Sequence, residues 1–294
     1  MPAPMPVTLS PMVRVTRSLR VRPRRRGTFA ALVTVALGGL LGSGVRAEED
    51  ALRTDWRVDG AVTAAAFAFW GGTQLLERRL APTDCRWCNP GSVDASVREA
   101  LRWNDTSAAN LASNLGAYLF VPLTSLGLLA LDARREDRLA ELPGDGLVIA
   151  EAVALNGALT QIVKFAVGRE RPFVHALPAA QRPLTAHPAD NNVSFYSSHT
   201  SFAFALAVST GTVASLRRTR WATAIWAVGL AGAATVGYLR IAADQHYFTD
   251  VLVGAAAGSA IGFVVPYGFH RQAGALAVSP VPGGGAMLTV TARL

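Results

Sequence analysis

Six long apolar stretches follow residue 57 and constrain the fold more than any other feature of this 294-residue chain. None of them alternates polar and apolar residues as a half-buried strand does, and all are rich in Ala, Leu and Val. Loops that contain Pro, Gly and Asp separate them. The pattern predicts an all-α fold, a single six-helix bundle. The predicted helices cover residues 58–76, 107–131, 147–167, 198–215, 221–241 and 250–269.

The composition points to a membrane. Only 16% of the residues are charged, against about a quarter in an average soluble domain. The stretches at 221–239 and 251–267 hold no charge and are near the minimum length for crossing a bilayer. Arginines gather in the loops after the second and fourth stretches, and the positive-inside rule places such loops in the cytoplasm. We therefore expect membrane association, with a wholly periplasmic bundle as the alternative.

The N-terminal segment carries the whole charge imbalance. The chain has a formal net charge of +8, and residues 1–47 hold eight arginines and no acidic residue. The rest of the chain is therefore neutral and lacks the positive field that attracts nucleic acid, so no nucleic-acid partner is expected. Basic residues followed by an apolar run at 29–41 and then small residues predict a secretory signal or an uncleaved anchor, and hence export.

The export prediction leaves the topology open. If the signal is removed and all six helices cross the membrane, the arginine-rich loops face outward, so either one helix does not span or residues 1–47 are not a simple cleaved signal.

Residues 48–272 form the predicted helical domain. Residues 273–294 contain two short extended pieces around a glycine-rich turn, which predicts an extended tail or a β-hairpin.

Cys85 and Cys88 form a lone CxxC pair in the loop at 83–92. No second pair and no histidine cluster follows, so a zinc site is poorly supported there. Asn89 after the second cysteine excludes the haem-attachment pattern. In an exported protein the pair predicts a local disulfide, with two free thiols as the alternative.

Lys164 is the only lysine of the chain, so its compact ammonium stands out among many arginines. If the helix at 147–167 continues, Lys164 and Arg171 lie two turns apart on one face, and Pro172 ends the helix. Two cations aimed the same way from an apolar helix are costly unless an anion lies between them. Phosphate suits both groups, so the pair predicts a phosphate site; a chance lysine near a helix end is the alternative.

Ser197, Ser198 and His199 stand where the fourth apolar stretch begins. Hydroxyl groups at a helix N-terminus ordinarily cap free backbone N–H groups, which is the plain role for the two serines. The same N–H groups also form an anion site. Beside a pair of cations, His199 becomes a candidate general acid instead of an ordinary polar residue.

A third group contains Arg240, His246 and Asp250. His246 and Asp250 are four residues apart, so on a helix the carboxylate would hold one imidazole nitrogen and leave the other free to attack. Arg240 adds a third cation. An ordinary acid at a helix N-terminus is the alternative for Asp250. The remaining histidines have no comparable setting: His175, His187 and His270.

The three segments resemble the signature of the type 2 phosphatidic acid phosphatase and vanadium haloperoxidase superfamily, K-x6-RP, PSGH and SR-x5-H-x3-D. The matching segments run from 164 to 172, from 196 to 199 and from 239 to 250, with every spacing kept, inside a core at 147–269. Three positions differ, since Tyr196, Ser198 and Leu239 replace Pro, Gly and Ser. Losing that glycine would crowd a backbone N–H that should approach the phosphoryl oxygens.

The resemblance implies a phosphatase that acts on phosphomonoesters or pyrophosphates, with a phosphorylated lipid or a small phosphate ester as substrate. It implies that His246, oriented by Asp250, attacks phosphorus and forms a phosphohistidine, while His199 protonates the leaving oxygen. No metal or other cofactor is implied. The groups expected to hold the phosphoryl oxygens are Lys164, Arg171, Arg240, Ser197 and the backbone near Ser198.

Three other functions stay open. A haloperoxidase of the same superfamily would hold vanadate as its cofactor in the same pocket. A broad-specificity periplasmic acid phosphatase would not need a lipid substrate, and a non-catalytic envelope protein would keep only the fold. In each case the motifs lie at the bundle end opposite the arginine-rich loops, so the site is expected to face the periplasm.

Overall fold

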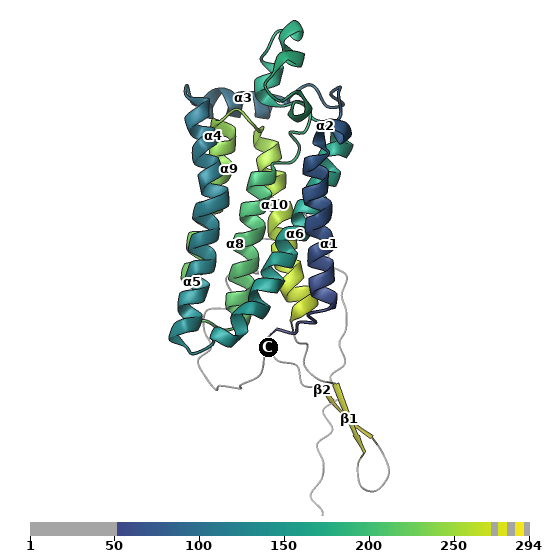
Figure 1. Ribbon diagram of the computed structural model, residues 1–294. Helices are drawn as coiled ribbons and strands as arrows, with labels where there is room; N and C mark the ends of the chain where they lie inside the picture. Colours follow the sequence, from purple (N-terminus) through teal and green to yellow (C-terminus); the bar gives the residue numbers. More distant parts are fainter. Residues whose placement is uncertain (1–51, 272–275, 281–285, 291–294) are drawn as a thin grey trace, which may run out of the picture. The chain divides into compact units, whose positions relative to one another are not determined.

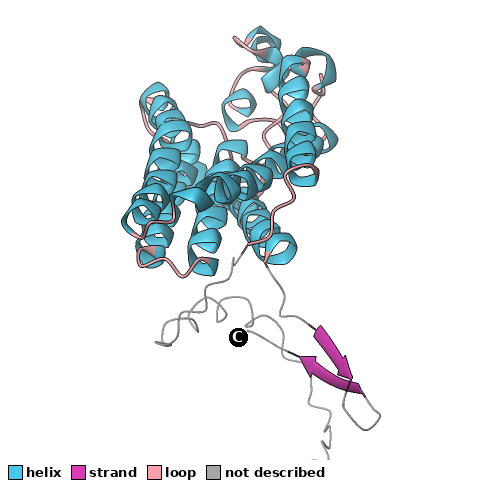
Figure 2. Ribbon diagram, turned by 60° about the horizontal axis from the view of Figure 1, so that its bottom comes forward, coloured by secondary structure: helices cyan, strands magenta, loops and turns pink. Residues whose placement is uncertain are grey.

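The computed structural model describes residues 52–271, 276–280 and 286–290. Between residues 52 and 271 helices are the main secondary structure (Figures 1 and 2), which confirms the all-α prediction. The signal or anchor predicted for residues 1–47 lies outside the described residues. In the tail, strands β1 (Leu276–Pro280) and β2 (Ala286–Val290) pair antiparallel, with Leu276 opposite Val290.

Each of the six apolar stretches forms a long helix. Two of the helices contain a π-helical segment, η2 in the second and η6 in the last. The long helices are α1 (Val58–Leu75), α4 (Thr106–Leu115) continued by η2 (Gly116–Phe120) and α5 (Val121–Arg135), α6 (Leu142–Val167), α8 (Ser198–Leu216), α9 (Ala222–Ala242), and α10 (Phe248–Val264) continued by η6 (Val265–His270). Short elements fill the connections: α2 (Glu77–Leu80), α3 (Ser92–Leu101), η3 (Leu139–Glu141), α7 (Pro172–His175), η4 (Ala179–Leu184) and η5 (Pro188–Asp190).

Helix α8 forms the centre of the bundle. It packs against α5, α6, α9 and α10, and nearly all of its residues from Ala203 to Ala214 are buried. A helix that is covered on all sides must be apolar or small all round, and α8 is built from Ala, Val, Leu, Ser, Thr and Gly. Its serine and threonine hydroxyls donate to carbonyls one turn earlier, so few of them need partners from other helices.

Glycines bring α10 close to α8. Gly254, Gly258 and Gly262 recur every fourth residue and are buried on the face of α10 that meets α8. A Cβ atom at Gly262 would lie 2.6 Å from the carbonyl oxygen of Ala205. The two backbones therefore approach more closely than any other residue would allow.

This contact gives a stability prediction. Gly262→Ala should lower the free energy of unfolding by about 1–3 kcal/mol, because the helices must move apart to admit the methyl group. Gly127→Ala in α5 is the control, since a Cβ there meets nothing within 4 Å. Thermal unfolding in detergent compares the two variants. Equal stability of both would contradict the close packing of α8 and α10.

The bundle has the surface of a membrane protein. Four helical segments are long and apolar enough to cross a bilayer: Thr106–Arg135, Leu139–Val167, Ala222–Ala242 and Phe248–His270. Large apolar side chains on them point outward, among them Leu111, Leu119 and Leu123 on the second helix and Leu252 and Phe263 on α10. An apolar exterior of this extent is unusual in water and suits contact with lipid tails.

Candidate active site

The three sequence motifs meet at one end of the bundle (Figure 1). The C-terminal ends of α6 and α9 and the N-terminal ends of α8 and α10 lie there, together with the loops at 168–197 and 243–247. The arginine-rich connections, from α5 to α6 and from α8 to α9, lie at the opposite end. The order of the helices alone therefore brings distant parts of the sequence together.

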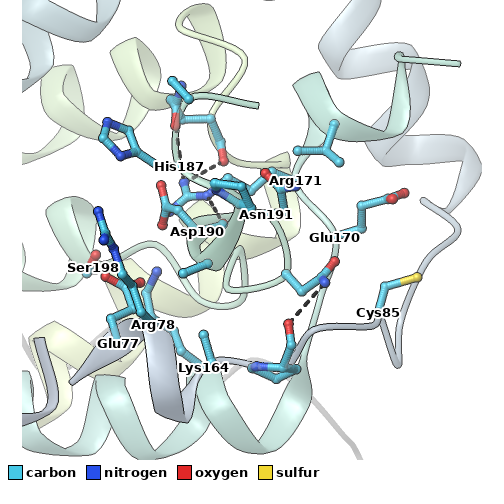
Figure 3. Close-up of a pocket in the computed structure, with 18 of the residues that line it drawn as sticks. Glu77, Arg78, Cys85, Lys164, Glu170, Arg171, His187, Asp190, Asn191 and Ser198 are labelled. Carbon is cyan, nitrogen blue, oxygen red and sulfur yellow. Dashed lines mark hydrogen bonds and ion pairs between the residues drawn. The ribbon is translucent and has the colours of Figure 1, made fainter. Parts of the chain in front are cut away.

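A cavity of about 1130 Å³ lies at this end. Five of the predicted residues line it: Lys164, Arg171, Ser198, His199 and Arg240. Figure 3 shows Lys164, Arg171 and Ser198 around the same space. His246 joins them through Arg171, whose Nη1 lies 3.3 Å from Nε2 of the histidine. His246, Ser197 and Asp250 are buried and are not among the residues that line the cavity, so His246 lies behind Arg171.

The prediction that Lys164 and Arg171 share a helix face is wrong. Helix α6 ends at Val167, because Gly168 adopts the left-handed conformation with a φ of 61°. Arg171 follows in extended backbone, with φ −73° and ψ 151°. A glycine in this conformation is a common helix end, and it turns the chain here so that both cations still reach the cavity.

Within the described residues, two of the three cations form no ion pair with a carboxylate. Nζ of the buried Lys164 donates to the carbonyl of Val193. Nη1 of Arg240 donates to Asn110 Oδ1 at 2.7 Å and Ser113 Oγ at 3.0 Å, and its buried Nε has no partner in the described part of the chain.

Arg171 is different, because Asp190 accepts from its guanidinium through a side-chain oxygen and the backbone carbonyl (Figure 3). Cations buried without a counterion are costly, so the cavity favours an anionic ligand.

The backbone sets the proton position on His246. Its Nδ1 lies 2.8 Å from the carbonyl oxygen of Ser194. A carbonyl can only accept, so Nδ1 carries the proton, and the unprotonated Nε2 accepts from Nη1 of Arg171 at 3.3 Å. Burial, followed by the nearby charges of Arg171 and Arg240, lowers the pKa of His246 well below 6.5. The ring is therefore neutral at pH 7, as a nucleophile must be.

Asp250 does not hold His246 directly, contrary to the helical-spacing hypothesis. His246 precedes α10, and its Nδ1 is 3.8 Å from the nearer carboxylate oxygen, too far for a hydrogen bond. That oxygen instead accepts from Ser194 Oγ at 2.6 Å and from the backbone N–H of Tyr247 at 2.9 Å. Asp250 thus caps α10 and anchors the residues on both sides of the imidazole.

Arg169 was not singled out by the sequence. It is 1% exposed and donates to Asp250 Oδ1 at 2.5 Å, Asp94 Oδ2 at 2.6 Å and Thr249 Oγ1 at 2.8 Å. Its guanidinium also lies over the rings of Trp87 and Tyr247. It belongs to the first motif segment, but its partner Asp94 sits on α3, a helix that no sequence pattern predicted.

His199 occupies the first turn of α8, where its ring packs against Tyr118. Its Nε2 donates to Asn114 Oδ1 at 2.8 Å, while the buried Nδ1 has no partner in the described part of the chain. Burial, then Arg240 and His246, lower the pKa of His199 well below 6.5. His199 is therefore neutral in the free protein, and a bound anion would raise its pKa by offsetting the nearby positive charges.

Residues 145–273 match the family model of the PAP2 superfamily. This match takes in all three sequence motifs and less than half of the chain. It is 30% identical over 148 residues to an undecaprenyl-diphosphatase of Sulfolobus acidocaldarius, a match that covers 50% of this chain and 62% of that protein. It also resembles the crystal structure of a transmembrane PAP2-type phosphatidylglycerolphosphate phosphatase from Bacillus subtilis, at 18% identity and a TM-score of 0.43, over 72% of this chain and 94% of that one.

The three departures from the PAP2 pattern have different surroundings. Tyr196 is buried, and its hydroxyl accepts a hydrogen bond from Thr160 at 3.2 Å, so it fills space between α6 and α8. Ser198 lines the cavity at the start of α8. Leu239 is buried apart from the cavity. Ser197, expected to bind phosphate, caps α8, since its Oγ accepts from the backbone N–H of Thr200 at 3.4 Å.

The CxxC loop packs against the candidate site through Arg86 and Trp87. Cys85 and Cys88 form a disulfide, and Arg86 between them donates to the carbonyls of Phe165 and Ala166 at the end of α6. Trp87 stacks on Arg169. The loop thus holds the chain on either side of Gly168, where it leaves α6 for the cavity.

Proposed function

We propose that this chain is a PAP2-type phosphatase that hydrolyses a phosphomonoester or pyrophosphate group carried by a lipid. The observation that carries the proposal is the cavity in which Lys164 and Arg240 lie buried without a carboxylate partner, beside Arg171 and two neutral histidines. A phosphoryl group supplies the missing negative charge, and fixed cations stabilise the charge that develops during its transfer.

In the proposed mechanism, Nε2 of His246 attacks phosphorus while the bond to the leaving oxygen breaks, which forms a phosphohistidine. His199 gives a proton to the leaving oxygen. Water, deprotonated by His199, then attacks phosphorus and releases inorganic phosphate. Three fixed cations replace the metal ion that many phosphoryl-transfer enzymes use, so no metal takes part in the chemistry. The carbonyl of Ser194 keeps the attacking nitrogen unprotonated.

His199 can act as a general acid only when the anionic substrate is bound. Its Nε2 proton is engaged with Asn114, so the leaving group must take a proton from Nδ1, which is unprotonated in the neutral ring. A phosphate beside Arg240 offsets the charges that hold the pKa of His199 down. The acid is therefore formed when the anion binds.

A lipid substrate is supported by the surface beside the cavity. An apolar groove of about 780 Å³ lies between η2 and α9 and is lined by Leu115, Leu119, Phe120 and Leu239. Leu239 directly precedes Arg240, so a chain lying in the groove would end near the cationic cavity. The similarity to an undecaprenyl-diphosphatase agrees with a lipid that carries a phosphorylated end.

The proposed site faces the outer side of the membrane. The arginine-rich connections lie at the other end of the bundle, and such loops stay in the cytoplasm. A substrate would then be presented from the outer leaflet, with its phosphate at the periplasmic surface.

Phosphate release from a panel of substrates tests the proposal. The panel holds undecaprenyl pyrophosphate, phosphatidic acid, phosphatidylglycerophosphate, lipid A and a water-soluble aryl phosphate, each assayed in matched detergent. We expect at least one lipid to be hydrolysed well above the soluble ester. Good hydrolysis of the soluble ester with no lipid turnover would contradict a lipid substrate. Peroxide-dependent halide oxidation with vanadate, without phosphatase activity, would show a haloperoxidase instead of a phosphatase.

The pH profile of kcat/KM should show the lowered pKa of His246. A lowered pKa keeps the nucleophile neutral in acid, so activity should persist as the pH falls below 6.5, the ordinary value for histidine. The profile is measured from about pH 4 to 9, with a correction for the second ionisation of the phosphate near about pH 6. An acidic limb at or above pH 6.5 in the corrected profile would contradict the buried, cation-surrounded imidazole.

A further inference from the structure

A second cluster of ionisable side chains lies far from the phosphate cavity. Asp59 at the start of α1, Glu151 in the first half of α6 and His270 at the end of η6 each offer one ligand atom, and these atoms lie within 4.8 Å of one another. None of them belongs to a PAP2 motif. No sequence pattern predicted a role for His270, because Asp59 and Glu151 are 211 and 119 residues away along the chain.

The hydrogen bond of the His270 ring leaves its Nε2 unprotonated and facing the other two side chains of the cluster. Its Nδ1 donates to the carbonyl oxygen of Arg53 at 2.9 Å, so Nε2 of the neutral ring holds a free electron pair. Histidines that bind metals typically donate their other ring nitrogen to a backbone carbonyl or a carboxylate in this way. The tautomer of His270 is therefore the one that a metal ligand requires.

Nε2 faces a carboxylate oxygen. Oε2 of Glu151 lies 3.3 Å from it, and the side chains are only 4% and 9% exposed. Neither atom has a hydrogen-bond partner in the part of the chain that the structure describes. Two buried acceptors at this distance repel one another unless a cation lies between them.

The 3.3 Å separation of His270 Nε2 and Glu151 Oε2 suits a small divalent cation, and the ligand atom of Asp59 lies within 4.8 Å of both. Bonds of about 2.0–2.1 Å to nitrogen and oxygen in tetrahedral geometry separate two ligand atoms by roughly 3.3 Å. Asp59 supplies a third oxygen, with Oδ2 held by the backbone N–H of Asp55 at 2.6 Å. Two carboxylates and one neutral imidazole carry a charge of about −2, which a divalent ion balances, and the imidazole favours zinc over magnesium or calcium.

We propose that Asp59, Glu151 and His270 bind one zinc-like divalent cation that joins α1, α6 and η6. The ion plays a structural role, remote from the phosphoryl chemistry. It secures the point where the chain enters the bundle, because Arg53 N–H donates to the carbonyl of His270 at 2.8 Å beside the cluster. A water molecule completes the coordination.

Zinc binding to the full chain tests the proposal. Protein purified in detergent without reductant, which keeps the Cys85–Cys88 disulfide closed, is stripped with a chelator and titrated with zinc in a calorimeter. We expect one zinc per chain, weaker binding of magnesium, and a rise in the unfolding temperature on adding zinc. Glu151→Gln and His270→Ala should each weaken zinc binding at least about 10-fold, whereas His246→Ala, at the other end of the bundle, should bind zinc as the wild type does.

Two results would overturn the cation site. One is the absence of saturable zinc binding together with an unfolding temperature that zinc does not change; the pair then shares a proton instead. The other is zinc binding that survives both Glu151→Gln and His270→Ala. If either variant fails to fold, Asp59→Asn at the less buried ligand and the zinc-dependent unfolding temperature of the wild type decide the question.

Discussion

Replacing His246 with alanine should abolish phosphate release, with a loss of at least about 10³-fold in kcat. The imidazole is 1% exposed, its Nδ1 is fixed by Ser194, and its Nε2 lies beside Arg171. No other described histidine contacts Arg171 in this way, since His199 is bound to Asn114 through its Nε2. Initial rates of phosphate release from the best lipid of the panel measure the effect.

His187→Ala is the matched control for this variant. His187 lines the same cavity but is exposed, and no hydrogen bond ties it to the motif residues within the described chain. We expect its activity to stay within about 3-fold of the wild type, because surface substitutions have small effects. Activity in purified, folded His246→Ala protein that equals the control would refute histidine nucleophilic catalysis.

Arg169→Met should destabilise the protein by about 3–5 kcal/mol, the cost of removing one partner from a buried ion pair. Asp94 and Asp250 would both lose their cation while 2% and 0% exposed, and methionine cannot donate to either. The rings of Trp87 and Tyr247 would lose the guanidinium between them as well. Chemical unfolding in detergent gives the free-energy difference.

Arg134→Met serves as the control for Arg169→Met. Arg134 is an exposed arginine at the end of α5, remote from the cavity, so its replacement should change stability by less than about 0.5 kcal/mol. Phosphatase activity should fall in Arg169→Met alone, because Asp250 positions Ser194 and through it His246. Wild-type stability of Arg169→Met would show that the two buried aspartates do not depend on this arginine.

The long helices were predictable because each has a local cause. Unbroken apolar runs must fold as helices to satisfy their backbone groups, so all six stretches appear near the expected residues. The short helix α3 was not predicted, since only half of its ten residues are apolar and its place depends on contacts such as Arg98 with Asp244. Its Asp94 nevertheless completes the network around Arg169.

The motif residues were also found from sequence, but their contacts were not. Spacing alone indicated that Asp250 would hold His246 and that Lys164 and Arg171 would share a helix. In the structure a left-handed Gly168 ends α6 early, and His246 lies in the turn before α10. A spacing of four or seven residues predicts a contact only inside a continuous helix. A helix end lies between the two residues of each pair, Lys164 with Arg171 and His246 with Asp250.

By itself the sequence determined an all-helical chain with a lone lysine, paired histidines and a spacing typical of phosphate handling. Only the tertiary structure decided the tautomers, with the proton on Nδ1 of His246 and on Nε2 of His199, and the close approach of Glu151 to His270. The reason is physical. Residue types follow from the sequence, but the choice of tautomer and counterion depends on backbone carbonyls and carboxylates that distant segments bring within about 3 Å.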